Sequence, residues 1–225
     1  LIKPYLKENN TFYEPFAGGL AVTLALEHPN TVVNDLNSEL INMYKVIRDN
    51  PEELISELKC FQNSHNTEFY YHVRNLDRTD MLSRMTDVVK AARTIYLNKT
   101  CFNGLYRVNS KGQFNSPIGR TSSGKTPDIV QEELIREMSQ YLKTVKFYNT
   151  DYRNCLVTAK AGDVVYLDPP YDQDESISTD GFVGYQKEGW TRENLKELKR
   201  LCDELISRGC KVIISNNDTE FVRQL

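Results

Sequence analysis

The sequence lacks the features that mark membrane, disulfide-linked and metal-binding proteins. In its 225 residues no apolar run approaches the roughly 20 residues that cross a bilayer, and no signal-like segment opens the chain. The five cysteines include no Cys-x-x-Cys pair, and the three histidines are scattered: Cys60, Cys101, Cys155, Cys202 and Cys210; His28, His65 and His72. We expect the histidines on the surface or in helices. These absences predict a reduced, cytoplasmic protein with no membrane span, disulfide framework, zinc site or other metal.

Neither end of the sequence has the form of a complete protein. The first residue is leucine rather than methionine, and residues 221–225 have the pattern of the middle of a helix. We therefore expect an internal portion of a longer chain. Its length and ordinary composition, 40% hydrophobic and 26% charged, fit one α/β domain with an insertion or two small domains.

Acidic residues are missing from one long stretch. Residues 90–125 contain seven Lys and Arg and no Asp or Glu, although the whole chain has a net charge of −3. Such an asymmetry favours a surface that binds a polyanion. A solvated basic face is the alternative.

The N-terminal segment has the pattern of a nucleotide-type binding unit. Residues 11–16 predict a strand, Ala17-Gly18-Gly19 a turn, and residues 20–27 an apolar helix. Glycines allow close approach of a ligand, although a tight packing turn would use them equally well. The phosphate-binding spacing G-x-G-x-x-G is absent, which disfavours a pyrophosphate cofactor.

A second strand is predicted at residues 31–34 and ends on Asp35. An acid at this position is placed to bind ribose hydroxyls, and the alternative is an N-cap for a helix that starts near Asn37. An adenosine that carries a carboxylate and no phosphate fits S-adenosylmethionine better than NAD or ATP.

The tetrapeptide Asp168-Pro169-Pro170-Tyr171 follows the apolar run of residues 164–167, which predicts a buried strand. A carboxylate and a neighbouring carbonyl can accept both hydrogens of an exocyclic amine while the tyrosine stacks on its ring. The alternative is a turn that ends the strand and carries a solvated Asp.

The middle of the chain predicts helices that interrupt the strand–helix alternation, at about residues 51–61, 67–76, 84–101 and 129–142. Between the last two, residues 103–115 predict a β-hairpin with its turn at residues 109–112. Its polar side chains suit contacts to base edges and phosphates: Arg107, Asn109, Lys111, Gln113 and Asn115. An exposed polar hairpin without a ligand is the alternative.

The remaining segments complete the predicted sheet. Residues 145–148 predict a strand, after which Asp151 could accept from an adenine amino group or cap a helix. Residues 172–188, with Phe182 and Tyr185, form a polar loop that we interpret as a lid. A helix to about Ser207 and a strand at residues 210–216 follow.

Five segments resemble the Dam-type, D12-class DNA adenine-N6 methyltransferases, in the same order: residues 14–19, 34–35, 102–107, 112–120 and 168–171. The resemblance covers almost the whole chain. It implies an α/β, Rossmann-like S-adenosylmethionine-dependent domain of residues 1–51 and 144–225. Residues 52–143 would then be an inserted, mainly helical target-recognition domain that carries the β-hairpin.

The resemblance also implies roles for individual residues. The implied cofactor-binding residues are Glu14, Pro15, Phe16, Gly18, Gly19, Asp35, Asp151, Tyr152 and Asp168. The implied catalytic residues, which would grip a flipped adenine, are Asp168, Pro169, Pro170 and Tyr171. The implied DNA contacts are Arg107, Asn109, Lys111, Asn115, Pro117, Arg120 and Tyr185. A Lys-Trp-x-Gly-Gly-Lys-like segment that helps such enzymes bind the cofactor has no match here, and the strands expected after Leu225 are also missing.

The resulting expectation is an enzyme that methylates N6 of adenine in double-stranded DNA, with GATC as the expected site. We expect it to be bacterial or phage-encoded and associated with the nucleoid. Restriction-modification, mismatch repair and phage protection stay open as its role. Methylation of RNA adenine or of a protein amide, and a catalytically inactive DNA-binding relative, stay open as alternatives.

Overall fold

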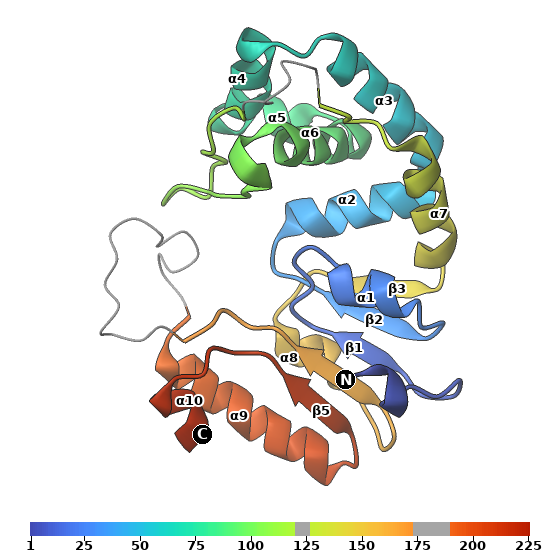
Figure 1. The fold of residues 1–225 in the computed structure, drawn as a ribbon, viewed down its shortest axis with the longest axis vertical. Coiled ribbons are helices and arrows are strands. Elements are labelled where there is room, and N and C mark those ends of the chain that lie inside the picture. The colour runs from blue at the N-terminus through green and yellow to red at the C-terminus, as the bar shows by residue number, and fades with distance from the viewer. Residues whose placement is uncertain (120–126, 173–189) are drawn as a thin grey trace. The chain divides into compact units, whose positions relative to one another are not determined.

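A computed structural model describes residues 1–119, 127–172 and 190–225 (Figure 1). The chain forms two compact units, one of residues 1–37 and 144–225 and the other of residues 38–143. The predicted recognition domain lies within the second unit. The predicted DNA contacts Arg120 and Tyr185 lie outside the described residues, as does nearly all of the predicted lid at 172–188.

The first unit is built on a parallel sheet with the strand order β3-β2-β1-β4-β5 in the described residues. The strands are β1 (Phe12–Glu14), β2 (Thr31–Asn34), β3 (Val145–Tyr148), β4 (Val164–Leu167) and β5 (Lys211–Ile214). Every neighbouring pair is parallel. The chain moves outward from β1 through β2 to β3 and then returns to place β4 on the other side of β1. This is the α/β, Rossmann-like arrangement that the sequence predicts.

The strands form at the predicted short apolar runs. Those predicted at residues 31–34, 145–148 and 164–167 have the predicted bounds. The first strand is shorter than predicted because Pro15 has no N–H to donate to the ladder. β1 and β2 are buried along their whole length, as expected for the centre of a parallel sheet.

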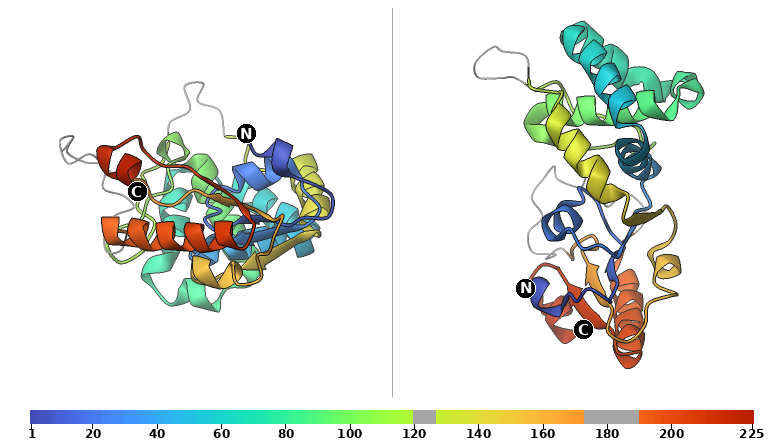
Figure 2. Two further views of the ribbon diagram at one scale, coloured as in Figure 1. Left: turned by 90° about the horizontal axis from the view of Figure 1, so that it is seen from below. Right: turned by 90° about the vertical axis from the view of Figure 1, so that its right-hand side faces the viewer.

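The helices of the first unit are η1 (Lys3–Tyr5), α1 (Ala21–Leu26), α8 (Tyr152–Cys155), α9 (Arg192–Ser207) and α10 (Glu220–Gln224). A capping box of Thr191 and Asn194 starts α9. Its apolar face, which includes Leu198 and Leu205, packs against Tyr13 and Val165 of the sheet. Figure 2 shows α9 lying along one side of the strands.

The second unit is mainly helical. Its helices are α2 (Ser38–Asp49), α3 (Pro51–Asn63), α4 (Thr67–Asn75), η2 (Leu76–Arg78), α5 (Met81–Arg84), α6 (Asp87–Thr100), η3 (Phe102–Gly104) and α7 (Glu132–Leu142). The helix predicted at 84–101 begins later, because Thr86 caps α6 by accepting from Val89 N (3.3 Å). Asn50 precedes α3 as predicted, but its side chain makes no capping bond.

Two predictions of local structure are wrong. The hairpin at 103–115 has the predicted turn, closed by Gly112 N to Asn109 O (2.9 Å), but its arms form one isolated bridge between Val108 and Phe114 instead of two strands. The arms are joined by Asn109 N to Gln113 O (2.9 Å) and Asn115 N to Arg107 O (2.8 Å), and the backbone N and O of Phe114 bond to side chains of the helical part of the unit. His28 is neither on the surface nor in a helix, since it is 6% exposed and its Nε2 lies 2.8 Å from Asn10 O.

Candidate active site

The carboxyl ends of β1, β2 and β4 carry the predicted cofactor-binding and catalytic residues. β1 leads into the turn at residues 15–19, β2 into Asp35, and β4 into Asp168. Because these strands are parallel neighbours, their carboxyl ends lie at one edge of the sheet. The strand order reverses between β1 and β4, which is where open α/β sheets bind ligands.

The turn after β1 is open at its two glycines. Gly18 has a φ of +46°, and a Cβ at Gly18 or Gly19 would meet nothing within 4 Å. Asp35 Oδ2 accepts from Gly18 N (2.8 Å), and its Oδ1 accepts from Asn37 N (2.8 Å). Asp35 therefore fixes the turn and also the segment before α2. A carboxylate has about four acceptor sites, so these bonds leave capacity for hydroxyl donors.

Asn34 ties three strand ends together and was singled out only as part of a motif. It is 1% exposed. Its Nδ2 donates to Pro15 O (3.1 Å) and Thr150 O (3.0 Å), and its Oδ1 accepts from Thr150 N (3.0 Å). The sequence could have indicated this role, because Asn34 ends a buried apolar strand and a buried amide needs several hydrogen-bond partners.

Glu14 is a buried carboxyl at the end of β1. It is 3% exposed, and its Oε2 accepts from Thr23 N (2.9 Å), one of the N–H groups at the start of α1. Leu20 occupies the N-cap position of α1 and offers no side-chain bond, so Glu14 supplies the acceptor from outside the helix. The pKa of Glu14 is raised to about 7, mainly by burial; hydrogen bonding to Thr23 opposes this rise, and the negative charge of Asp168 contributes to it.

Three aromatic rings pack together beside the turn. Phe16 lies 5.0 Å from Tyr152 and 5.5 Å from Trp190 between ring centroids, and Tyr152 lies 5.9 Å from Trp190. The Nε1 of Trp190 is buried and has no hydrogen-bond partner within the described part of the chain. Sequence reasoning assigned Trp190 no role except at the start of a helix.

Asp151 caps α8. It accepts from Arg153 N (2.9 Å) and forms an ion pair with the Arg153 guanidinium (2.7 Å). This bond to Arg153 lowers the pKa of Asp151. The capping alternative for Asp151 is therefore confirmed, while contact with an adenine stays a prediction.

The predicted catalytic turn, residues 168–171, has two exposed side chains next to a buried proline. Pro169 is buried and Pro170 is half-buried, whereas Asp168 is exposed and Tyr171 is 41% exposed. The Tyr171 hydroxyl donates to Asp168 Oδ1 (2.8 Å), and this bond raises the pKa of Tyr171. One carboxylate oxygen is thereby held in place by the neighbouring ring.

Asp172 anchors the chain directly after this turn and was missed by sequence reasoning except as part of the loop. It is 6% exposed and accepts from Arg192 Nε (2.9 Å) and from the hydroxyl of Thr219 (2.7 Å). Its backbone N donates to Asn216 Oδ1 (2.9 Å), and its backbone O accepts from Asn217 Nδ2 (2.7 Å). These bonds tie the turn to the segment after β5 and to the start of α9.

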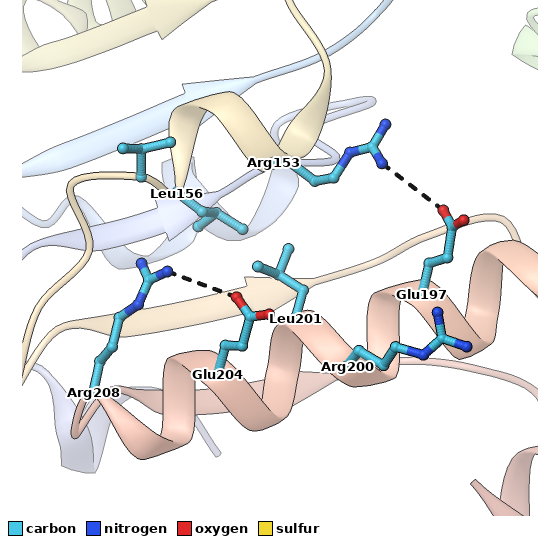
Figure 3. A pocket seen from close by; sticks show the side chains of 8 residues that line it. Arg153, Leu156, Glu197, Arg200, Leu201, Glu204 and Arg208 are labelled. Carbon is cyan, nitrogen blue, oxygen red and sulfur yellow. Dashed lines mark ion pairs between the residues drawn. The ribbon is translucent and has the colours of Figure 1, made fainter.

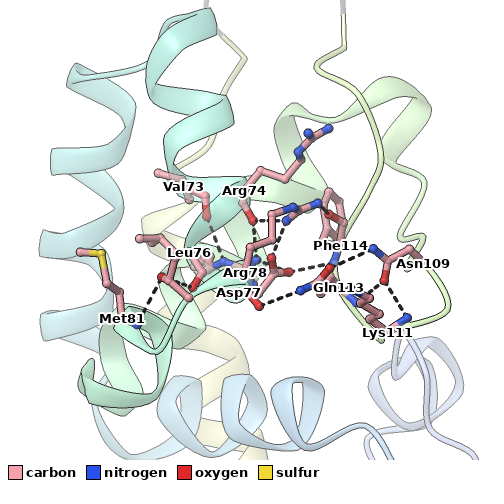
Figure 4. Close-up of polar contacts among 12 residues, drawn as sticks. Val73, Arg74, Leu76, Asp77, Arg78, Met81, Asn109, Lys111, Gln113 and Phe114 are labelled. Carbon is pink, nitrogen blue, oxygen red and sulfur yellow. Dashed lines mark hydrogen bonds and ion pairs between the residues drawn. The ribbon is translucent and has the colours of Figure 1, made fainter.

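Among the described residues, the predicted DNA contacts lie in the second unit, on a loop of residues 102–118 (Figure 4): Arg107, Asn109, Lys111, Asn115 and Pro117. Lys111 is exposed and close to the turn, and Pro117 is exposed further along. Arg107 is half-buried, and its Nε donates to Asn115 Oδ1 (2.8 Å). Asn109 closes the turn by accepting from the N–H groups of Lys111 and Gln113 (2.9 and 3.0 Å), so its oxygen has a structural role.

A hollow of about 420 Å³ lies elsewhere in the first unit, between α8 and α9 (Figure 3). Four of its five charged lining residues form two pairs, Arg153 with Glu197 (3.8 Å) and Arg208 with Glu204 (3.7 Å). It contains none of the predicted site residues, and its mixed charges favour no ligand class.

The described residues contain no group of three or more His, Cys, Asp or Glu side chains that could hold a metal ion. No helix among them has the length and apolar character that a membrane crossing requires.

Known proteins of similar sequence indicate the family of this chain. The protein family described as "D12 class N6 adenine-specific DNA methyltransferase" matches residues 1–225. The chain is 41% identical over 218 residues to the type II methyltransferase M1.LlaDCHI of Lactococcus lactis subsp. cremoris, covering 96% of this chain and 75% of that protein. It is 34% identical over 225 residues to the retron Ec67 DNA adenine methylase of Escherichia coli (100% and 74%). It is 29% identical to the DNA adenine methylase of Escherichia coli K12 (99% and 77%). The chain belongs to the D12 class of N6 adenine-specific DNA methyltransferases.

Proposed function

We propose that this chain transfers the methyl group of S-adenosylmethionine to N6 of an adenine flipped out of duplex DNA, within the sequence GATC. The observation that carries the proposal is the position of residues 168–171 at the carboxyl end of β4, next to the open turn after β1. This arrangement puts a group that can hold an amine beside a surface that can hold a cofactor.

The residues at this edge fit S-adenosylmethionine. The open glycine turn allows close approach, and Asp35 keeps acceptor capacity for ribose hydroxyls. The ring of Phe16 offers a stacking surface, and the buried Nε1 of Trp190 is a donor without a partner in the described structure. When bound, S-adenosylmethionine supplies an electrophilic methyl group on a sulfonium.

The role of the catalytic turn is to orient the amine. Asp168 and the Pro169 carbonyl accept the two N6 hydrogens, which increases electron density on the nitrogen, while Tyr171 stacks on the base. As a bond forms between N6 and the methyl carbon, the bond from that carbon to the sulfonium sulfur would break and leave neutral S-adenosylhomocysteine. N6 becomes acidic only as the methyl arrives, so its proton would pass to the Asp168 carboxylate that accepts it as a hydrogen bond. Asp168 therefore acts mainly by positioning, helped by the Tyr171 hydroxyl that holds one of its oxygens.

The second unit supplies the DNA contacts in this proposal. The stretch from residue 90 to 125 is basic and free of acids, which suits binding to phosphates. Arg107 is suited to guanine edges in the major groove, and Lys111 to phosphates. Flipping is needed because the amine of a paired adenine is tied up within the stack, and it costs a few kcal/mol. GATC as the site rests on the resemblance of residues 102–120 to Dam-type enzymes.

The test is transfer of labelled methyl from S-adenosylmethionine to duplex oligonucleotides that contain GATC or a scrambled site. Label on N6 of the GATC adenine is the expected result. Label on another sequence would refute the specificity and keep the chemistry. Label only on single-stranded RNA or on a protein amide would refute the DNA substrate.

A pair of isosteric variants tests the catalytic turn. Asp168→Asn should abolish transfer and leave cofactor affinity nearly unchanged, because a neutral amide has a single oxygen for the Tyr171 hydroxyl and the substrate amine and carries no negative charge to accept the N6 proton. Asp203→Asn changes an exposed acid of α9 that pairs only with Lys199 among the described residues, and it should behave as the unmodified protein. Turnover retained in Asp168→Asn would overturn the assignment.

A further inference from the structure

A buried ion pair fixes the junction of α4 and η2 in the second unit (Figure 4). The side chain of Arg93 is 1% exposed and that of Asp77 is 10% exposed, with 2.8 Å between Arg93 Nη2 and Asp77 Oδ2. Arg93 also donates to Val73 O (3.1 Å) and Arg74 O (3.0 Å). These carbonyls belong to the last turn of α4, where Val73 O also accepts from Leu76 N and Arg74 O also accepts from Arg78 Nη1 (2.9 Å). The buried cation therefore holds Asp77 in one position.

Asp77 and its neighbour hold the DNA-binding loop by its backbone. Asp77 Oδ2 accepts from Phe114 N (2.8 Å), and Arg78 Nη2 donates to Phe114 O (2.7 Å). The backbone O of Asp77 accepts from Gln113 Nε2 (3.4 Å). Both polar backbone atoms of Phe114, which is 2% exposed, are thus bound to adjacent charged side chains. Bonds to charged groups are stronger than neutral ones, so this attachment is firm.

The attachment continues from Phe114 to Arg107. Phe114 pairs with Val108 in the bridge that joins the two arms of the hairpin. The next residue, Asn115, donates its N–H to Arg107 O (2.8 Å), and its Oδ1 accepts from Arg107 Nε (2.8 Å). The position of Phe114 therefore sets both the backbone and the guanidinium of Arg107.

We propose that Asp77, held by Arg93, is a specificity-determining positioning residue that fixes Arg107 for reading one base pair. This inference rests on the proposed role of Arg107 in DNA recognition. A bidentate contact to a base edge is geometrically strict and discriminates by roughly ten- to a hundredfold. Loss of the Asp77 charge leaves the buried Arg93 with one counter-charge among the described residues, Glu39, whose Oε1 lies 3.5 Å away.

The experiment compares Asp77→Asn, Arg107→Ala and the double variant in full-length protein. The readout is kcat/KM for methylation of the preferred duplex and of duplexes with one base pair changed. Arg107→Ala identifies the base pair at which discrimination falls, and Asp77→Asn should lower discrimination about tenfold at the same base pair. The double variant should lose no more than Arg107→Ala alone, because both changes act through one contact. S-adenosylmethionine affinity should not change.

A matched control separates positioning from general destabilisation. Glu52→Gln makes the same chemical change at an exposed pair with Arg136 in this unit and should leave discrimination intact. Amide hydrogen exchange without DNA should rise in residues 105–116 of Asp77→Asn and stay unchanged in α3. Equal loss on all duplexes, with faster exchange across the whole unit, would overturn the proposal.

Different results would overturn the role of Arg107 and the role of Asp77. If Arg107→Ala leaves discrimination at every base pair unchanged, the proposed role of Arg107 fails and this inference falls with it. If Arg107→Ala relaxes one base pair and Asp77→Asn does not, or if their losses add, only the role of Asp77 is overturned.

Discussion

Replacing Glu14 by glutamine isolates the cost of burying a carboxyl at the end of β1. The pKa of Glu14 is raised from an ordinary 4.5 to about 7, mainly by burial. The folded protein therefore keeps the Glu14 proton between pH 4.5 and 7, where the unfolded chain has already lost it. In that window the unfolding free energy falls as the pH rises, because the native state binds more protons than the unfolded state.

The magnitude follows from the size of the shift. One pKa unit corresponds to 1.36 kcal/mol, so the rise to about 7 gives a loss of about 3 kcal/mol between pH 4.5 and pH 8. Glutamine does not titrate and can keep the bond from Thr23 N, and its amide can donate to Thr23 Oγ1, which has no partner among the described residues. Glu14→Gln should therefore match the unmodified protein near pH 5 and exceed it by up to about 3 kcal/mol at pH 8.

The assay is urea unfolding at pH values from 5 to 8, followed by tryptophan fluorescence. Trp190 is the only tryptophan in the sequence and lies in the first unit, against Phe16, so its signal reports on the part that contains Glu14. Glu8→Gln changes an exposed carboxyl of the same unit and is the matched control. Parallel pH profiles for Glu14→Gln and the unmodified protein would refute the reasoning.

Three further predictions concern the same edge of the sheet. Asn34→Ala leaves Pro15 O and both polar atoms of the Thr150 backbone without their partner and should lower the unfolding free energy by about 3 kcal/mol in the same urea assay; a loss below about 1 kcal/mol would show that water replaces the amide. Asp35→Ala should weaken S-adenosylmethionine binding at least about tenfold in calorimetric titration, because it loosens Gly18 and removes ribose acceptors; unchanged affinity would contradict this. Tyr171→Phe should lower kcat about tenfold by releasing Asp168, and Tyr171→Ala should lower it further by removing the stacking ring; equal turnover in the two variants would exclude stacking.

The sequence by itself predicted the elements of the first unit and the turns that carry its chemistry. Short apolar runs define β2, β3 and β4, with Pro, Gly or Asp close to the ends of β2 and β4, and Thr191 marks the start of α9, because these signals act over a few neighbouring residues. The same local logic found the Gly18–Gly19 turn and the tetrapeptide after β4. It also found the turn at residues 109–112, which depends on Gly112.

The tertiary structure decided what lies beside what. Strand order places Asp168 next to the turn after β1, and no pattern within either segment states that order. Asn34 bonds to Thr150, and Asp77 bonds to the backbone of Phe114, across long sequence separations, so neither role is visible in local periodicity. The attachment of the hairpin is hidden from local patterns for the same reason, since Asp77 and Arg78 of η2 bind the backbone of Phe114 from a distant part of the sequence. Local propensity selects the elements, and the need of buried polar groups for partners decides how distant segments join.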